Sequence, residues 1–138
     1  MMTIGGLDIG STGAKITVMN QSGKLLYSGY QDYPVARNIA THEVNAEDIW
    51  KVIKSMLMGA SAVVPGLTAI GVTSFGESFV LLNRNDEVLM PTMMYTDPRG
   101  DSEADLLKTK LGDDFIKTTA GVASHSMYSL PKLMWIRD

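Results

Sequence analysis

Three short segments of the sequence combine side chains that could bind a charged or hydroxyl-rich ligand. The first, at residues 8–15, reads DIGSTGAK. A tight turn of glycine, serine and threonine leaves backbone N–H groups and hydroxyls unblocked, and this favours an anion such as a nucleotide phosphate. Asp8 could hold Mg²⁺ directly or through water, and Lys15 could neutralise phosphate charge. The candidate phosphate-binding residues are therefore Asp8, Gly10, Ser11, Thr12 and Lys15.

The alternative for this first segment is an ordinary hairpin. Asp and Gly are common in hairpin turns, and Lys15 would then be a solvent-facing strand residue. The glycine spacing matches neither the Walker A motif nor the Rossmann fingerprint, because the segment leads into a strand instead of a helix. The spacing alone favours the hairpin.

The second segment, TSFGES at residues 73–78, follows an apolar run that is typical of a buried strand. Ligands of open α/β sheets lie beyond the carboxyl ends of strands, so Glu77 is well placed to accept hydrogen bonds from a polyol. A surface loop with a solvated glutamate is an equally good interpretation.

The third segment, at residues 95–99, reads YTDPR. Asp97 and Arg99 together could bind neighbouring hydroxyls of a sugar, and Tyr95 could provide a ring face. The competing interpretation makes Asp97 the cap of a helix and Arg99 an exposed residue of its first turn. The spacing does not overturn that interpretation.

The composition narrows the class of protein. The chain has 138 residues, of which 45% are hydrophobic, and a formal net charge of −3. This length suffices for one sizeable core, and the charge disfavours non-specific binding to nucleic acid or anionic lipid. The absence of cysteine excludes disulfides and thiolate metal sites and agrees with a reducing cytoplasm. No stretch approaches the roughly 18 apolar residues that span a bilayer, so no membrane segment is expected.

Periodicity and turn residues predict the elements that position these segments. Strands are expected around residues 4–9, 14–19 and 25–30, forming a three-stranded antiparallel meander. Apolar residues at helical spacing predict a helix over 49–60, capped by Asn45. Residues 67–73 are expected to be a strand covered on both faces and parallel to its neighbour. Further extended pieces are expected at 79–82 and 93–95 around a turn at 83–86.

The remaining chain is predicted to be helical. A helix should start at Asp97-Pro98 and end at Gly112, a short helical turn should follow at 114–118, and a last helix should begin near Ser129. That last helix has no stop signal, so we expect the chain to be cut at or just after a helix.

Several of these segments occur in a specific order: LDIGST at 7–12, the capped helix, IGVT at 70–73, FVLL at 79–82, MYTDPR at 94–99 and KLMW at 132–135. In this order they resemble the start of an FGGY-family carbohydrate kinase, over essentially the whole chain. The resemblance implies an α/β fold, the ribonuclease H-like fold of the sugar kinase, Hsp70 and actin superfamily. It implies that residues 1–138 are the N-terminal part of the first kinase domain, without the rest of that domain or the C-terminal domain.

The resemblance also assigns roles to residues. The family phosphorylates polyols and ketoses from Mg-ATP, so ATP, Mg²⁺ and a small-molecule sugar are the expected ligands. Asp8 matches the aspartate near Mg²⁺, and Gly10, Ser11, Thr12 and Lys15 match the first phosphate loop. The matched substrate-contacting positions are Glu77, Tyr95, Asp97, Arg99 and Met127, with Tyr128 as the alternative to Met127. Gly76 replaces the arginine of glycerol kinases, which favours a pentulose or deoxy-hexulose over glycerol.

The catalytic aspartate that acts as general base is expected beyond Asp138, so no catalytic residue is assigned here and the chain alone is expected to be inactive. We expect the full-length protein to be cytoplasmic, and a homodimer is one expectation for it. A nucleotide-controlled, non-enzymatic ATPase-fold protein is the alternative. A ribonuclease H-like nuclease needs several clustered carboxylates, and only Asp8 can be placed on the meander.

Overall fold

The computed structural model describes residues 2–138, which form two compact units. One unit contains residues 2–35 and 45–76 and is called the sheet unit below. The other contains residues 36–44 and 77–138 and is called the helical unit. The first candidate segment lies in the sheet unit and the third in the helical unit, whereas the second, at residues 73–78, is divided between the two units.

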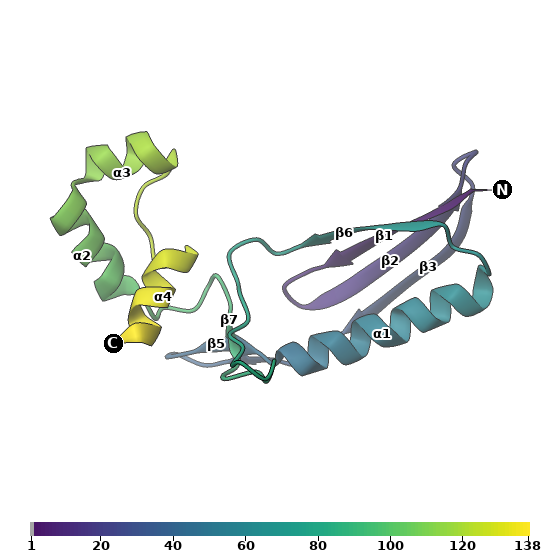
Figure 1. Ribbon diagram of the computed structural model, residues 1–138, viewed down its shortest axis with the longest axis horizontal. Coiled ribbons are helices and arrows are strands. Elements are labelled where there is room, and N and C mark those ends of the chain that lie inside the picture. Colours follow the sequence, from purple (N-terminus) through teal and green to yellow (C-terminus); the bar gives the residue numbers. More distant parts are fainter. Residues whose placement is uncertain (1) are drawn as a thin grey trace. The chain divides into compact units, whose positions relative to one another are not determined.

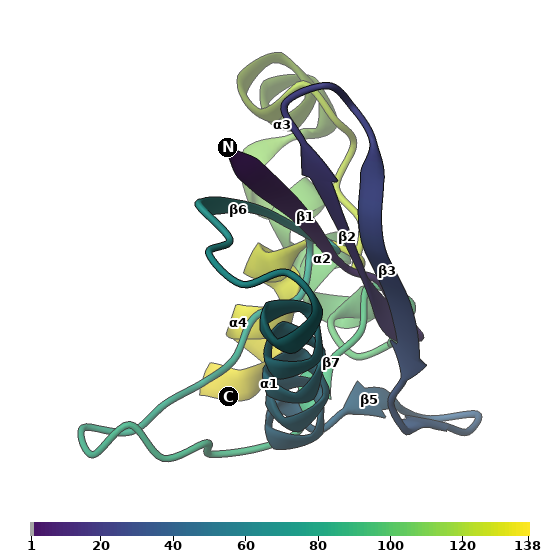
Figure 2. The ribbon, with the colours of Figure 1, turned by 90° about the vertical axis from the view of Figure 1, so that its right-hand side faces the viewer.

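The sheet unit starts with the predicted meander. Strands β1 (Thr3–Ile9), β2 (Gly13–Asn20) and β3 (Leu25–Asp32) pair antiparallel in sequence order. Figure 2 shows these strands side by side. Leu7 lies opposite Ile16 in the β1–β2 register, and both are buried. Period-2 alternation of apolar residues therefore predicts the buried face correctly.

Helix α1 (Ala46–Val63) connects the meander to strand β6 (Ala69–Ser74). Its cap is confirmed, because the Asn45 side chain accepts a hydrogen bond from the backbone N–H of Glu47 at 2.9 Å. The helix runs along one face of the sheet, against β2 and β3 (Figure 1). Its buried residues are Val52, Ile53, Met56 and Ala60. Strand β6 pairs parallel to β1, as predicted, and gives the mixed sheet the order β3-β2-β1-β6.

The burial of β6 differs from the prediction. Residues 67–73 were expected to be covered on both faces, but every residue of β6 is exposed, and Val72 is 63% exposed. The reason is topological. Strand β6 lies at the edge of the sheet, and α1 packs against β2 and β3 instead. An apolar run identifies a strand but not which residues cover it.

The helical unit combines a small sheet with three helices. The sheet contains β4 (Val35–Arg37), β5 (His42–Val44) and β7 (Thr92–Met93), with β5 antiparallel to β7. The helices are α2 (Asp101–Leu111), α3 (Asp113–Ala120) and α4 (Ser129–Arg137). The predicted end of a helix at Gly112 and the predicted start of the last helix near Ser129 are confirmed.

Two predictions for this unit are wrong. The helix starts at Asp101, four residues after the expected start at Asp97, and Gly100 with φ 103° occupies the N-cap. Residues 79–82 form no strand beyond an isolated bridge from Leu82 to Val88. The turn at 83–86 is present, since the Asn83 side chain accepts the backbone N–H of Asn85 at 2.8 Å. Such side-chain turns are local and therefore predictable.

Candidate active site

The first candidate segment forms the connection between β1 and β2. The Gly10 N–H donates to the carbonyl of Gly13 at 2.9 Å, which closes a tight turn. A Cβ atom on Gly13 would lie 2.7 Å from the carbonyl oxygen of Gln31, so only glycine allows this approach to β3. Ser11 is half-buried and Thr12 is exposed. The loop is thus fixed at its base and open at its tip.

Tyr33 fixes this loop and was not found from the sequence. Its side chain is 4% exposed, and its hydroxyl donates to the carbonyl of Gly10. Its backbone N–H donates to the carbonyl of Thr12 at 3.4 Å. Burial, with smaller contributions from Tyr30 and Asp8, raises the pKa of Tyr33 to about 12, so the phenol stays protonated at neutral pH. No local motif marks such a residue, because its contacts depend on the meander being folded.

We expect Tyr33→Phe to lower the free energy of unfolding by about 1 kcal/mol, because the half-buried Gly10 carbonyl loses its donor. Urea denaturation followed by circular dichroism measures this change. Tyr95→Phe, at a tyrosine 42% exposed, is the matched control and should change stability by less than about 0.5 kcal/mol. Equal effects of the two substitutions would contradict the assigned bond.

The polar side chains of the sheet unit gather on one face of the sheet. Asp8 lies opposite Lys15 in the antiparallel register and opposite Thr73 in the parallel one, so these three side chains share a face. Paired Gly6 and Gly71 leave this face open, because a Cβ on either would contact nothing within 4 Å. The result is a shallow cavity of about 490 Å³, lined by Gly6, Leu7, Asp8, Lys15, Thr17, Gly71, Val72 and Thr73. The structure therefore joins an exposed carboxylate and an exposed ammonium beside a tight turn.

This arrangement fits a magnesium-bound phosphate better than a metal held by protein alone. Within residues 2–138, no cluster of three or more His, Asp and Glu residues could hold a metal ion. Mg²⁺ commonly binds through one or two carboxylates together with substrate phosphates and water. A lone Asp8 carboxylate, with Lys15 as a phosphate counter-charge, matches that donor set.

The third candidate segment centres on a buried ion-pair network in the helical unit. Asp97 is 1% exposed. Its Oδ1 accepts from the backbone N–H of Arg99 at 3.0 Å and from Arg99 Nε at 2.8 Å. Its Oδ2 accepts from Arg99 Nη2 at 2.6 Å and from the backbone N–H of His42 at 2.8 Å. Arg99 Nη2 also donates to Glu43 at 2.6 Å, and the Trp135 ring lies 5.1 Å from the Arg99 guanidinium carbon.

Both charges of this network are stabilised by their partners. Burial acts to raise the pKa of Asp97, but hydrogen bonds from Arg99 and from the backbone of His42 outweigh it and lower the pKa. The hydrogen bond to Asp97, with Glu43 adding to it, raises the pKa of Arg99 despite burial. The pair is therefore ionised at neutral pH. Bidentate carboxylate–guanidinium pairs of this kind have a fixed geometry.

The structure contradicts the helix-cap interpretation of this segment. Asp97 caps no helix, because its carboxylate is used by His42 and Arg99. Arg99 is not an exposed first-turn residue, because its side chain is only 15% exposed and precedes α2. Within the segment, Tyr95, Thr96 and Pro98 are exposed. Both carboxylate oxygens of Asp97 already have protein partners.

The other two predicted substrate residues also lie in the helical unit. The Glu77 side chain is half-buried, and its backbone carbonyl accepts from the Ser129 hydroxyl at 3.4 Å. Met127 is half-buried in a turn, where its N–H donates to His125 Nδ1 at 3.0 Å. Among the described residues, no hydrogen bond or ion pair joins either side chain to Arg99, so their grouping with Arg99 stays a prediction.

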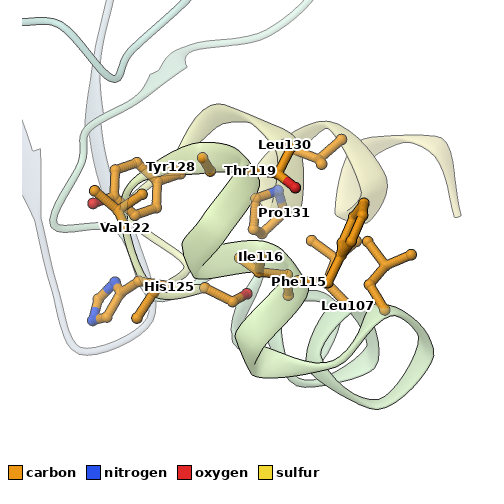
Figure 3. Close-up of a pocket in the computed structure, with 13 residues that line it drawn as sticks. Leu107, Phe115, Ile116, Thr119, Val122, His125, Tyr128, Leu130 and Pro131 are labelled. Atoms are coloured by element: carbon orange, nitrogen blue, oxygen red, sulfur yellow. The ribbon is translucent and has the colours of Figure 1, made fainter.

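A separate pocket of about 370 Å³ lies among α2, α3 and the start of α4 (Figure 3). Leu107, Phe115 and Ile116 form one side, and Val122 and Tyr128 lie across from them. The lining is almost wholly apolar, so it does not suit a sugar or a phosphate. Tyr128 lines this pocket and Met127 does not, and the choice between them as the substrate-contacting position stays a prediction.

The described chain contains no helix long and apolar enough to cross a membrane. The sequence matches a family model described as "FGGY family of carbohydrate kinases, N-terminal domain" over residues 3–138. It is 26% identical to gluconokinase of Bacillus subtilis and 23% identical to xylulose kinase of Lactococcus lactis, each over 96% of this chain. The chain spans only 26% and 27% of the length of these two relatives.

Solved structures agree on the fold. Gluconate kinase and ligand-bound xylulose kinase, both from Lactobacillus acidophilus, match with a TM-score of 0.91 at 23% identity. The two matches extend over 99% and 100% of this chain, but over only 28% and 29% of the chains of the two kinases. The mixed α/β fold is therefore that of these two sugar kinases. Together with the family match over residues 3–138, these findings place the chain in the FGGY family of carbohydrate kinases.

Proposed function

We propose that the whole protein transfers the γ-phosphate of ATP to a hydroxyl of a sugar or polyol. The observation that carries this proposal is the pairing of Asp8 with Lys15 beside the tight turn at residues 10–13, in a chain of this family. The turn offers backbone and hydroxyl donors to phosphate oxygens. Lys15 neutralises part of their charge, and Asp8 holds the metal that accompanies the nucleotide.

In this proposal, Asp8 would hold Mg²⁺, which would supply charge neutralisation for the phosphates when the γ-phosphoryl group is transferred and ADP leaves. The protein's own contribution is to place the phosphates and the accepting hydroxyl in line and to exclude water. Gly10, Ser11 and Thr12 orient the phosphates, and Tyr33 holds the Gly10 carbonyl so that the turn keeps its shape. Phosphoryl transfer is catalysed mainly by such positioning and electrostatics.

The sugar would be bound by side chains of the helical unit. Tyr95, Arg99, Glu77 and Met127 are the proposed contacts, whereas Asp97 acts mainly by holding Arg99. We favour a pentulose or deoxy-hexulose over glycerol, because Gly76 stands where glycerol kinases have arginine. Relatives named gluconokinase, xylulose kinase and glycerol kinase are 23–26% identical, so overall similarity does not choose among these substrates.

We further propose that residues 1–138 are the N-terminal part of the first kinase domain and that the general base lies after Asp138. On this proposal the 138-residue chain alone is inactive. Because the phosphate donor is ATP, we place the activity in the cytoplasm. A homodimer and the absence of nucleic-acid binding stay predictions from the sequence.

The experiment is a coupled ADP-release assay of the purified whole protein with Mg-ATP and a panel of ketoses, aldonates and polyols. We expect ADP release that requires one class of sugar, and no sugar-dependent release from the 138-residue chain. Nucleotide hydrolysis that is indifferent to every sugar would overturn the kinase and favour the nucleotide-controlled regulatory protein. Sugar-dependent release by the short chain would overturn the placement of the base.

A further inference from the structure

Lys132 is a buried charged residue to which the proposed function gives no role. It lies in the first turn of α4, and its side chain is 0% exposed. Burying an ammonium group costs several kcal/mol unless hydrogen bonds and opposite charge compensate for it. The compensating groups therefore indicate what the residue holds in place.

Both hydrogen-bond partners of Lys132 lie in the third candidate segment. Lys132 Nζ donates to the backbone carbonyl of Asp97 at 2.8 Å and to that of Arg99 at 3.4 Å. Gly100 packs against the first turn of α4. A Cβ atom on Gly100 would lie 3.1 Å from the carbonyl carbon of Pro131 and 3.2 Å from the backbone nitrogen of Lys132. The backbone of residues 97–100 is thus fixed on the start of α4.

Lys132 also adds a positive charge beside this cluster. Glu43 and Asp97 both bind Arg99 Nη2, which leaves two carboxylates facing one guanidinium. Lys132 supplies the second cation. Burial lowers the pKa of Lys132, while the charge of Asp97 opposes that change. The charge of Asp101 acts on the pKa of Lys132 in the same direction as that of Asp97, and the charge of Arg99 acts in the opposite direction.

The fixed backbone leads directly to the exposed side chains of the segment. The Asp97 N–H donates to the carbonyl of Met94 at 3.0 Å, which makes a four-residue turn with Tyr95 and Thr96 at its exposed corners. When Asp97 is held, the turn that presents Tyr95 is held as well. The same carbonyl contacts fix the backbone from which the Arg99 side chain extends.

We propose that Lys132 is a positioning residue for sugar binding: its ammonium holds the backbone carbonyls of Asp97 and Arg99, and thereby fixes Tyr95 and Arg99 toward the substrate. This inference rests on the proposed function. It concerns a residue that touches neither sugar nor nucleotide. Its effect should therefore fall on sugar binding and leave nucleotide binding unchanged.

The test uses the whole protein with Lys132→Met, which keeps most of the length of the side chain and removes its charge. We expect the KM for the sugar to rise about tenfold with the KM for ATP unchanged, because a small misplacement of binding groups weakens the productive complex. We also expect faster backbone hydrogen exchange confined to residues 94–101, measured by mass spectrometry. The matched control is Lys117→Met at an exposed lysine of α3, which should change neither quantity.

Lys132→Gln, which retains a neutral donor, should give an intermediate sugar KM and is the second variant if Lys132→Met does not fold. An unchanged sugar KM together with unchanged exchange at 94–101 would overturn the proposal. So would exchange that rises throughout the protein with sugar and ATP parameters affected alike, because that pattern reports a general loss of stability. If the wild-type protein phosphorylates no sugar, the proposed function fails, and the local exchange result still decides whether Lys132 holds this segment.

Discussion

Arg99→Met is expected to lower the free energy of unfolding by about 3–5 kcal/mol, because it leaves the Asp97 carboxylate buried without its cation. Asp97 has no exposed side-chain surface, and three of the hydrogen bonds to its carboxylate come from Arg99. The substitution removes the hydrogen bonds from Arg99 Nε and Nη2 but keeps the bond from the Arg99 backbone. Water cannot easily replace the two lost bonds, because Asp97 is buried. Urea denaturation followed by circular dichroism measures the loss.

Two controls separate this effect from the loss of an ordinary arginine. Arg84→Met, at an exposed residue of the 83–86 turn, should change stability by less than about 0.5 kcal/mol. Adding Asp97→Asn to Arg99→Met removes the stranded charge and should recover part of the lost stability. Equal losses for Arg84→Met and Arg99→Met would contradict the buried network.

The pH dependence of stability gives an independent test of the Asp97–Arg99 pair. The folded-state pKa of Asp97 lies below its ordinary value of 3.8. A carboxyl group whose pKa is lower in the folded than in the unfolded protein stabilises the fold at pH values above its unfolded-state pKa. This stabilisation is lost as the pH falls through the folded-state pKa. The wild type should therefore lose this contribution below about pH 3.8, and Asp97→Asn should not show that part of the acid dependence.

Local patterns predicted those elements whose hydrogen bonds are local. The meander follows from alternation and from turns such as residues 20–23, and α1 follows from its apolar spacing and the Asn45 cap. Strands β4 and β5 have three residues each and leave no periodic pattern to detect. The exposure of β6 could not be predicted, because it depends on strand order and not on the sequence of the strand.

The candidate site was predictable as residue types but not as geometry. Asp97 followed by proline satisfies the local rule for a helix start, yet its carboxylate binds the N–H of His42, 55 positions earlier in the chain. Glu43 and Lys132 join the network from β5 and α4, and neither has a motif that points to Asp97. Tertiary hydrogen bonds to a buried carboxylate outweigh a helix cap, because an unpaired buried charge costs more than a lost cap.

Asp8→Asn in the whole protein is expected to reduce kcat/KM for sugar phosphorylation by about 10²–10³-fold, since it removes the carboxylate proposed to hold the nucleotide's metal. The side chain is exposed on the open face of the sheet, so the substitution should leave the fold intact. Asn is nearly the same size as Asp and lacks only the charge. The loss should therefore appear in activity and in the Mg²⁺ concentration required, with unfolding by urea nearly unchanged.

The control for this prediction is Asp114→Asn, the same change at an exposed aspartate of α3, which should leave kcat/KM within about twofold of wild type. Lys15→Met is the companion variant, because Lys15 shares the sheet face with Asp8 but carries the opposite charge. It should weaken ATP binding measured by calorimetry even when Mg²⁺ is omitted, whereas Asp8→Asn should weaken only the Mg²⁺-dependent part. If both variants weakened metal-free ATP binding equally, Asp8 would be acting on the shape of the loop and not on the metal, and the assignment of Asp8 would be wrong.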